Sequence, residues 1–440
     1  MEVKTFEGGV HIPHYKYYTE DKPITTMKTP DQVVIPMVQH TGAPCQPLVK
    51  EGDKVKIGQK IGESEEFISA PVHSSVTGTV KAVEPRPYYT GTDVESVVIE
   101  VEGDKQEFEP EIERNPDDMS IDEVKEAIKE AGLVGMGGAA FPTFVNINQA
   151  QPIDTLLVNG AECEPFLTCD HRQMAELADK LVSGSRILMR VIGATRCSIG
   201  IEVNKPDAIE AVREAIKDST DMEVVPLAAK YPQGFKSFLI KAVTGRDVPR
   251  GARSAALGCI VRNVGTTIST YEAVVYGKPL IERVVTVSGP KVPRAGNYLI
   301  KIGTPVGFIL QECGLEPEHL EGHKVIIGGP MTGMAQENLD APIIKSNTGV
   351  LALPPEMVYE DEYEDCIRCG KCVDNCPMYL YPNQISTFAE AGFLEESQEW
   401  NINDCIECGI CAFNCVANRP IVQMIKRTKL EIQKSQKAKK

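Results

Sequence analysis

Apolar residues recur along the chain at two spacings, and these spacings predict helices and strands in alternation. Residues 121–131 repeat apolar positions every three or four residues, which is typical of an amphipathic helix, and Ser120 stands at the N-cap position. The expected buried face consists of Ile121, Val124, Ile128 and Ala131. The apolar run DTLLVNG at 154–160 is bounded by turn residues and predicts a buried strand. We therefore expect an α/β domain in this part of the chain.

Shorter patterned segments flank this region. Residues 33–83 carry the pattern V-x-x-G-D-x-V-x-x-G-Q, then a strand and G-x-V, which is the pattern of the lipoyl or biotinyl barrel-sandwich fold. Carriers of that fold have a lysine at the tip of a hairpin, whereas the segment ESEEFISAP has none. The module is therefore expected to be structural or a docking surface. Residues 283–335 predict short strands around a helix from Pro305 to Cys313.

Composition and charge narrow the class of protein. A length of 440 residues corresponds, as a prior, to three or four domains. The net charge of −16 argues against general nucleic-acid binding, because the phosphate backbone would be repelled. No run of about 18 apolar residues occurs, and the N-terminus lacks the apolar segment of a signal peptide. We therefore expect a cytoplasmic protein with no transmembrane segment of its own.

The charges are unevenly distributed towards the C-terminus. Residues 356–365 carry six acids, and the last twenty residues carry seven Lys or Arg. The basic end is either a solvated helix end or a contact for anionic lipid or an acidic partner.

Eight of the fourteen cysteines occur in two runs, CIRCGKCVDNCP and CIECGICAFNC, each spaced C-x2-C-x2-C-x3-C. In a reducing cytoplasm this spacing indicates metal binding, and it is typical of [4Fe–4S] clusters whose fourth ligand comes from the other run. One cluster is expected on Cys366, Cys369, Cys372 and Cys415. The other is expected on Cys405, Cys408, Cys411 and Cys376. Two zinc sites are the alternative.

The segment between the two cysteine runs is long for a compact ββ ferredoxin. Asn383 stands as an N-cap before a helically spaced stretch, and Pro420 stands near the first turn of another. We therefore expect a helical two-cluster module. Two clusters transfer single electrons and perform no bond chemistry, so the electron donor and acceptor are expected elsewhere.

A second candidate site lies in residues 132–164. Gly135, Gly137 and Gly138 fall within four positions, and glycines at this density let backbone N–H groups approach a phosphate or a flat ring. The predicted strand then runs into AECEP, and acids at the carboxyl end of such a strand lie where α/β domains usually bind ligands. A tight structural turn is the alternative, and the Rossmann fingerprint is absent.

Three motifs together, GLVGMGGAAFPT, NGAECEP and NVGTT, resemble the flavoprotein subunit of respiratory complex I, which binds FMN and NADH. The order of all parts, from VVIPMVQHTGAPCQPLVKEGDKV to KYPQG and CIECGICAFNC, is still more similar to the C subunit of the Rnf complexes, which are ion-translocating ferredoxin:NAD oxidoreductases. The resemblance covers essentially the whole chain. It implies a multidomain α/β protein.

The implied modules, in chain order, are four folded units and a tail. They are an N-terminal arm with a barrel-sandwich hybrid domain (1–110), an α/β domain that binds FMN and NADH (115–280), a β-grasp domain (281–350), a helical two-[4Fe–4S] ferredoxin domain (360–430) and a basic tail (431–440).

The resemblance also implies the ligands of a non-covalent FMN, which are Gly135, Gly137, Gly138, Asn159, Glu162, Asn263 and Thr266. The glycine turn cradles the FMN, and Asn159 and Glu162 lie near its ring system or ribityl chain. Asn263 and Thr266 match positions that help hold the flavin phosphate. For NAD(H), Phe141 matches an aromatic residue that stacks on the adenine, and Glu164 matches an acid that faces NADH. No catalytic side chain is expected, since the cofactors carry the chemistry.

The chain departs from the family pattern at three places. Ala161 stands where complex I has Asp. Asn146 replaces a Lys that usually follows the FPT turn, which removes one cation from the flavin phosphate region. After YPQG, Phe235–Ser237 replace a small residue, Glu and Lys, and this change can return positive charge from another side. Flavin binding is expected to survive these changes.

The sequence thus predicts a peripheral oxidoreductase subunit at the cytoplasmic face of the membrane. It exchanges hydride between NAD(H) and FMN and single electrons through two [4Fe–4S] clusters. Its expected partners are the other subunits of a membrane electron-transport complex, including an iron–sulfur subunit that accepts electrons from ferredoxin. A soluble paralogue that passes NADH electrons to a cytoplasmic reductase is one alternative. A flavin-free cluster relay or assembly scaffold is the other.

Overall fold

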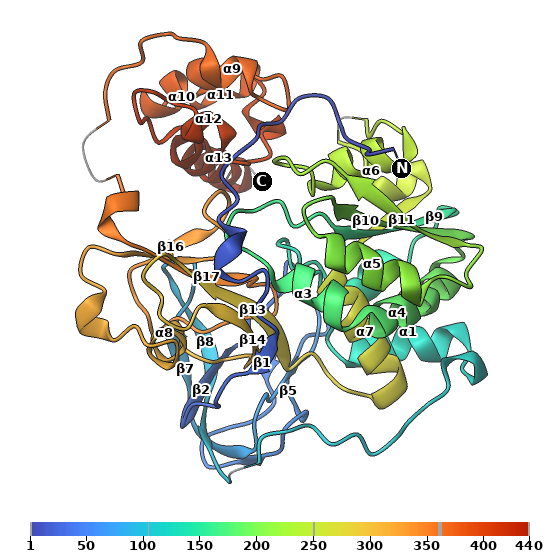
Figure 1. Ribbon diagram of the computed structural model, residues 1–440. Coiled ribbons are helices and arrows are strands. Elements are labelled where there is room, and N and C mark those ends of the chain that lie inside the picture. The colour runs from blue at the N-terminus through green and yellow to red at the C-terminus, as the bar shows by residue number, and fades with distance from the viewer. Residues whose placement is uncertain (1, 104, 250, 360–362, 439–440) are drawn as a thin grey trace.

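The computed structural model describes residues 2–103, 105–249, 251–359 and 363–438. Part of the acidic segment at 356–365 and the last two residues of the basic tail therefore lie outside the described residues. A β-rich module, an α/β domain and a mixed sheet pack together, and the helical C-terminal module lies above them (Figure 1). No helix in the described ranges combines the length and the apolar content needed to cross a membrane.

The N-terminal β module consists of two small antiparallel sheets around one apolar core. Their strand orders are β2-β8-β7-β4 and β3-β5-β6. Val33, Ile61 and Val97 are among the core residues with no exposed surface. The strands are β2 (Gln32–Pro36), β3 (Gln46–Pro47), β4 (Lys54–Val55), β5 (Lys60–Glu63), β6 (Val72–His73), β7 (Gly78–Pro87) and β8 (Asp93–Val101).

The α/β domain is built on a four-stranded parallel sheet with the order β11-β10-β9-β12. Its strands are β9 (Thr155–Gly160), β10 (Arg196–Glu202), β11 (Met222–Leu227) and β12 (Cys259–Asn263). Its helices are α1 (Ile121–Glu130), α2 (Thr143–Ile147), α3 (Cys169–Glu176), α4 (Ala178–Ile192), α5 (Pro206–Ala215), α6 (Lys236–Thr244) and α7 (Val264–Tyr276). The chain adds β10 and β11 on one side of β9 and β12 on the other. The order therefore reverses between β9 and β12, and the carboxyl ends of these two strands border a crevice where open α/β sheets bind ligands.

The predicted helix at 121–131 is present as α1. Ser120 caps it in a capping box with Glu123, and Val124 and Ile128 are buried. The expectation for Ile121 was wrong, because its side chain is 44% exposed. Helical periodicity assigns a residue to a face but does not fix how far along the helix that face is covered.

A mixed six-stranded sheet follows, with the order β1-β14-β13-β17-β15-β16. It packs against α8 (Val306–Glu312), which begins after Pro305 as expected. The strands are β1 (Ile24–Thr26), β13 (Glu282–Ser288), β14 (Gly296–Lys301), β15 (Lys324–Ile327), β16 (Met334–Gln336) and β17 (Gly349–Leu353). The edge strand β1 comes from the N-terminal arm, so the arm belongs to this sheet and not to the β module next to it in sequence.

The N-terminal arm also contacts the α/β domain before it reaches the mixed sheet. Lys4 forms a bridge with Leu227 at the end of β11, and Val10 pairs with Tyr231 in the following loop. In Figure 1, the arm is the dark-blue irregular segment that runs past the helical module. It therefore connects parts of the chain that are far apart in sequence.

The C-terminal module is helical, as predicted. It contains α9 (Lys371–Asp374), α10 (Pro382–Glu390), α11 (Leu394–Glu399), α12 (Ile410–Phe413) and α13 (Ile421–Ala438). The basic end of the chain forms the last turns of α13 as far as Ala438. The expectation that Asn383 caps α10 was wrong, because Pro382 occupies the first helical position and Asn383 follows it inside the helix. Short 3₁₀ turns lie at Lys16–Tyr18, Pro116–Asp118, Ser254–Leu257, Pro317–His319, Pro355–Met357 and Ile402–Asp404.

Candidate cofactor sites

The turn that contains Gly135, Gly137 and Gly138 precedes α2 and is called the glycine turn. A backbone hydrogen bond closes it, and it is open beside Gly138. The Gly135 N–H donates a hydrogen bond to the Phe141 carbonyl at 2.9 Å. Gly138 has a φ of +132°, a conformation that residues with side chains rarely adopt, and no atom lies within 4 Å of the place where its Cβ would be. The turn therefore leaves room for a group that approaches its backbone.

Neighbouring domains hold this turn in place. Lys345, from the mixed-sheet domain, is buried and donates from Nζ to the Pro71 carbonyl at 2.7 Å and to the Gly132 carbonyl at 2.8 Å. Thr41, from the β module, donates from Oγ1 to the Ala139 carbonyl at 2.7 Å. The mixed-sheet domain and the β module thus fix the position of the glycine turn.

The turn lies against the N-terminus of α7. The Met136 N–H donates to Thr266 Oγ1 at 2.9 Å, and a Cβ on Gly137 would lie 3.2 Å from the Cβ of Asn263. Asn263 Oδ1 accepts from the Gly265 N–H at 2.9 Å and caps the helix. A helix N-terminus beside a glycine turn is favourable for a phosphate group, because the helix dipole favours negative charge there.

Asn159 stands at the crevice between β9 and β12. It is the register partner of Asn263, so the two predicted flavin residues lie side by side at the carboxyl ends of adjacent strands. Asn159 Nδ2 donates to the Gly234 carbonyl at 2.8 Å, and its Oδ1 accepts from the Ala161 N–H at 3.2 Å. The end of β9 is therefore joined to the YPQG loop of residues 231–234.

Glu162 caps the N-terminus of α3. Its two carboxylate oxygens accept from the Asp170 N–H at 2.8 Å and the His171 N–H at 3.3 Å. Asp170 in turn accepts from Asn263 Nδ2 at 2.6 Å. Burial, and secondarily the charge of Glu162, raises the pKa of Asp170 to about 7. Sequence reasoning missed Asp170, although an acid in the CDHR segment soon after AECEP was a usable signal.

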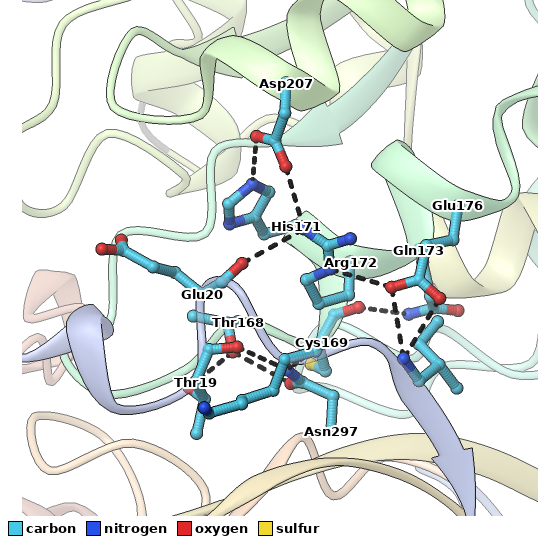
Figure 2. A network of polar contacts seen from close by, with 12 residues as sticks. Thr19, Glu20, Thr168, Cys169, His171, Arg172, Gln173, Glu176, Asp207 and Asn297 are labelled. Carbon is cyan, nitrogen blue, oxygen red and sulfur yellow. Dashed lines mark hydrogen bonds and ion pairs between the residues drawn. The ribbon is translucent and has the colours of Figure 1, made fainter.

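Helix α3 is fixed from both ends by the polar network in Figure 2. At its start, Thr168 Oγ1 donates to Asn297 Oδ1 at 2.9 Å and lies 2.7 Å from Thr19 Oγ1. Within the helix, His171 Nε2 lies 2.6 Å from Asp207 Oδ1. The N-terminal arm, the mixed sheet and α5 thus hold Asp170 in its place beside Asn263.

The two residues predicted to contact NAD(H) lie in different local surroundings. Phe141 is half-buried at the glycine turn. Glu164 is bound to a turn of the mixed-sheet domain, where it accepts hydrogen bonds from the Met331 N–H at 3.0 Å and from Thr332 Oγ1 at 2.5 Å. Burial raises the pKa of Glu164. Phe141 therefore lies in the glycine turn, and Glu164 joins the α/β domain to the mixed-sheet domain.

The eight predicted cluster cysteines line two cavities in the helical module. One cavity is lined by Cys376, Cys405, Cys408 and Cys411, together with apolar residues that include Ile385 and Ile425. The other is lined by Cys366, Cys369, Cys372 and Cys415. Each cavity therefore combines three cysteines of one run with the last cysteine of the other. Across the described part of the chain, no three or more His, Cys, Asp or Glu side chains converge on a point where a single metal ion would fit.

The first of these cavities adjoins the α/β domain. Tyr231, in the YPQG loop, donates from its hydroxyl to the Cys408 carbonyl at 2.6 Å. Ile12, Tyr231 and Ile410 form a small apolar cluster at the same boundary. On the other side, a Cβ on Gly409 would lie 2.7 Å from the Met331 carbonyl oxygen. Sequence spacing could not have indicated these contacts, since they join segments that are distant along the chain.

Comparison with known families defines the class of protein. The RnfC barrel sandwich hybrid domain matches residues 4–104, the Nuo51 FMN-binding domain matches residues 128–272, and the 4Fe-4S dicluster domain matches residues 358–418. Together with the glycine turn and the two cysteine-lined cavities, these matches define a modular flavin and iron–sulfur electron-transfer protein.

Two relatives match nearly the full length. The chain is 44% identical to the C subunit of the proton-translocating ferredoxin:NAD(+) oxidoreductase complex of Clostridium ljungdahlii, over 98% of this chain and 94% of the relative. It is 43% identical to the C subunit of the Na(+)-translocating ferredoxin:NAD(+) oxidoreductase complex of Acetobacterium woodii, over 98% of both chains. The chain belongs to the RnfC family, the C subunits of the ion-translocating (Rnf) ferredoxin:NAD(+) oxidoreductase complexes.

The predicted family membership is therefore confirmed, and so are the barrel-sandwich, FMN-binding and two-cluster parts of the predicted fold. In fold alone, the chain is also similar to a chain of an NAD+-reducing [NiFe]-hydrogenase, with a TM-score of 0.51 and 19% sequence identity over 72% of this chain and 63% of that chain.

Proposed function

We propose that this chain is the NAD(H)-oxidising or NAD+-reducing subunit of an ion-translocating ferredoxin:NAD+ oxidoreductase, with FMN and two [4Fe–4S] clusters as its cofactors. The observation that carries the proposal is the direct contact between the YPQG loop of the α/β domain and the backbone of Cys408. This contact places a cysteine-lined cavity against the domain that contains the glycine turn. Electron transfer between a flavin and a cluster needs such proximity.

The residues at the turn fit an FMN. Gly135, Gly137 and Gly138 leave backbone exposed on an open face, and the capped N-terminus of α7 favours a phosphate. Asn159 and Asn263 have amide groups at the crevice between β9 and β12. A bound flavin supplies hydride exchange with a nicotinamide and transfer of single electrons. The protein's part is to hold the ring, the phosphate and the dinucleotide in register.

We assign the two cysteine-lined cavities as the cluster sites. Cys376, Cys405, Cys408 and Cys411 would hold the cluster next to the YPQG loop, and Cys366, Cys369, Cys372 and Cys415 the other. Crossed ligation of this kind is typical of two-cluster ferredoxins. Cys366 and Cys369 are exposed, so the second site lies nearer the protein surface.

The remaining modules and the location are part of the same proposal. Residues 281–350 form the β-grasp domain, to whose sheet the N-terminal arm adds β1 and in which β17 continues to Leu353. The boundaries 1–110, 115–280, 360–430 and 431–440 describe the other units and the basic tail. The protein lies at the cytoplasmic face of the membrane as a peripheral subunit. The exposed basic residues Arg427 and Lys434 of α13 supply a surface for the membrane partners.

An anaerobic titration with NADH tests the proposal. Protein reconstituted with FMN and clusters is expected to lose its oxidised-flavin absorbance as NADH is added. A flavin that NADH does not bleach would refute the dehydrogenase function. A protein that holds clusters and no flavin would support the cluster relay instead. Co-purification with detergent-solubilised membrane proteins, and not with a soluble reductase, would separate the membrane-complex function from that of the soluble paralogue.

A further inference from the structure

Arg262 is a buried cation without a counter-charge. Its side chain is 6% exposed, and no ion pair joins it to a carboxylate among the residues that the structure describes. Its Nη2 donates to Asn146 Oδ1 at 2.7 Å and its Nη1 to the Val261 carbonyl at 3.2 Å. Its Nε is buried and has no hydrogen-bond partner. A buried guanidinium left in this state is costly, so the arrangement calls for an anion.

A second cation, Lys236, lies within electrostatic range of Arg262, and Arg253 lies within electrostatic range of Lys236. Burial, and then the charges of Arg262 and Arg253, lowers the pKa of Lys236. Lys236 is the first residue of α6, whose N-terminus has no side-chain cap, and both Lys236 and Arg253 reach solvent. No described carboxylate offsets the charge of Lys236 or Arg262. Positive groups from three separate segments therefore lie near one another around Lys236.

The cluster borders the crevice already described. Arg262 immediately precedes Asn263 at the carboxyl end of β12, and its bond to Asn146 joins it to α2, directly after the glycine turn. The buried charge of Arg262 therefore lies at the border of the crevice.

We propose that Arg262, Lys236 and Arg253 form a phosphate-binding subsite of the cofactor crevice, in which Arg262 is the buried positive group. The inference rests on the proposed function, because the phosphate belongs either to the FMN or to the dinucleotide. Asn146 orients the guanidinium through its side-chain oxygen, and a planar guanidinium suits the paired oxygens of a phosphate.

The experiment compares ligands with and without phosphate on flavin-free protein of full length. Affinities of FMN and riboflavin are measured by flavin fluorescence, and those of ADP-ribose and adenosine by calorimetry. Arg262→Gln is expected to weaken one phosphate-bearing ligand by about 10- to 100-fold while its phosphate-free partner binds as before. Adding Asn146→Lys to the Arg262→Gln variant is expected to restore much of the preference for the ligand that carries phosphate. Lys217→Gln, which removes an exposed charge elsewhere in the domain, is the matched control.

The outcomes separate the two sources of phosphate. If the variant has a smaller ratio of FMN affinity to riboflavin affinity than the wild type, the subsite binds the flavin phosphate. If it has a smaller ratio of ADP-ribose affinity to adenosine affinity, the subsite binds a phosphate of the dinucleotide. Because Arg262→Gln changes a buried position, the exposed pair Lys236→Gln/Arg253→Gln is measured as well, with a several-fold loss expected. Unchanged ratios in both variants would overturn the inference while leaving the proposed function intact. Wild-type protein that binds no flavin would refute the proposed function, and the ADP-ribose measurement would still decide the subsite.

Discussion

The hydroxyl of Tyr231 lies 2.6 Å from the carbonyl oxygen of Cys408, and this bond joins the α/β domain to the cluster module. Tyr231 is 2% exposed, and its ring packs with Ile12 and Ile410. Cys408, which accepts this hydrogen bond, lines one of the two cysteine-lined cavities. It makes the cavity of Cys376, Cys405, Cys408 and Cys411 the one adjacent to the YPQG loop.

Tyr231→Phe is expected to slow electron transfer between flavin and clusters without affecting flavin reduction by NADH. Loss of the hydrogen bond weakens the domain contact by about 1 kcal/mol, which is roughly a five-fold change in the population of the closed contact. Stopped-flow absorbance separates flavin bleaching from cluster reduction. Tyr276→Phe, on the far end of α7, should leave both phases unchanged. Equal slowing of both phases in Tyr231→Phe would place its role at the flavin site.

Crossed ligation can be tested with paired cysteine substitutions. Cys376→Ser and Cys405→Ser lie in the same cavity, so the double variant is expected to lose about as much iron as either single variant, roughly half of the total. Cys376→Ser with Cys366→Ser affects both cavities and should remove nearly all the iron. Iron and sulfide analysis of anaerobically purified protein gives the result. The opposite pattern would show that each run binds its own cluster, and zinc in place of iron would favour two zinc sites.

Replacing either of two glycines near the crevice by alanine is expected to have different effects on stability and on flavin binding. A Cβ at Gly234 would lie 2.2 Å from the Ala161 carbonyl oxygen, so Gly234→Ala should destabilise the protein by about 1–3 kcal/mol. A Cβ at Gly135 has no atom closer than 3.7 Å, so Gly135→Ala should unfold at the wild-type temperature but bind FMN more weakly. Calorimetric unfolding and flavin titration distinguish these effects. Unchanged flavin affinity in Gly135→Ala would contradict a cradle at this position.

The raised pKa of Asp170 makes stability depend on pH. The folded protein keeps the Asp170 proton up to a pKa of about 7, whereas the unfolded chain releases it near pH 4. Stability is therefore lost as the pH rises from about 4 to about 7, because the unfolded state binds fewer protons than the folded state over this window. Asp170→Asn should remove this loss, so its stability relative to wild type should increase by at most about 4 kcal/mol between pH 4 and pH 8.

Chemical unfolding of both proteins at several pH values measures the difference. Glu126→Gln, at an exposed position on α1, is the control and should follow the wild-type curve. A constant difference between Asp170→Asn and wild type across this range would mean that Asp170 is ionised throughout.

Much of the architecture could be predicted because it depends on neighbours in sequence. The cap of Ser120 on α1, the strand at 154–160 and the helical character of the cluster module all follow from local spacing and capping chemistry. The cysteine spacing likewise determined the kind of cofactor, since three thiols within seven residues suit one cluster. The glycine turn followed from composition alone. These features need no knowledge of distant residues.

Tertiary structure decided which of these local features meet. Sequence patterns could not show that β1 leaves the β module for the mixed sheet, that Glu164 binds the backbone of Met331, or that Arg262 faces Asn146. Each of these contacts joins residues that are distant in sequence and depends on how whole domains pack. The spacing of apolar residues within a helix or strand shows which of its faces is buried, but not which other element covers that face. The charge balance and the neighbours of a cofactor site arise only when several such elements are brought together.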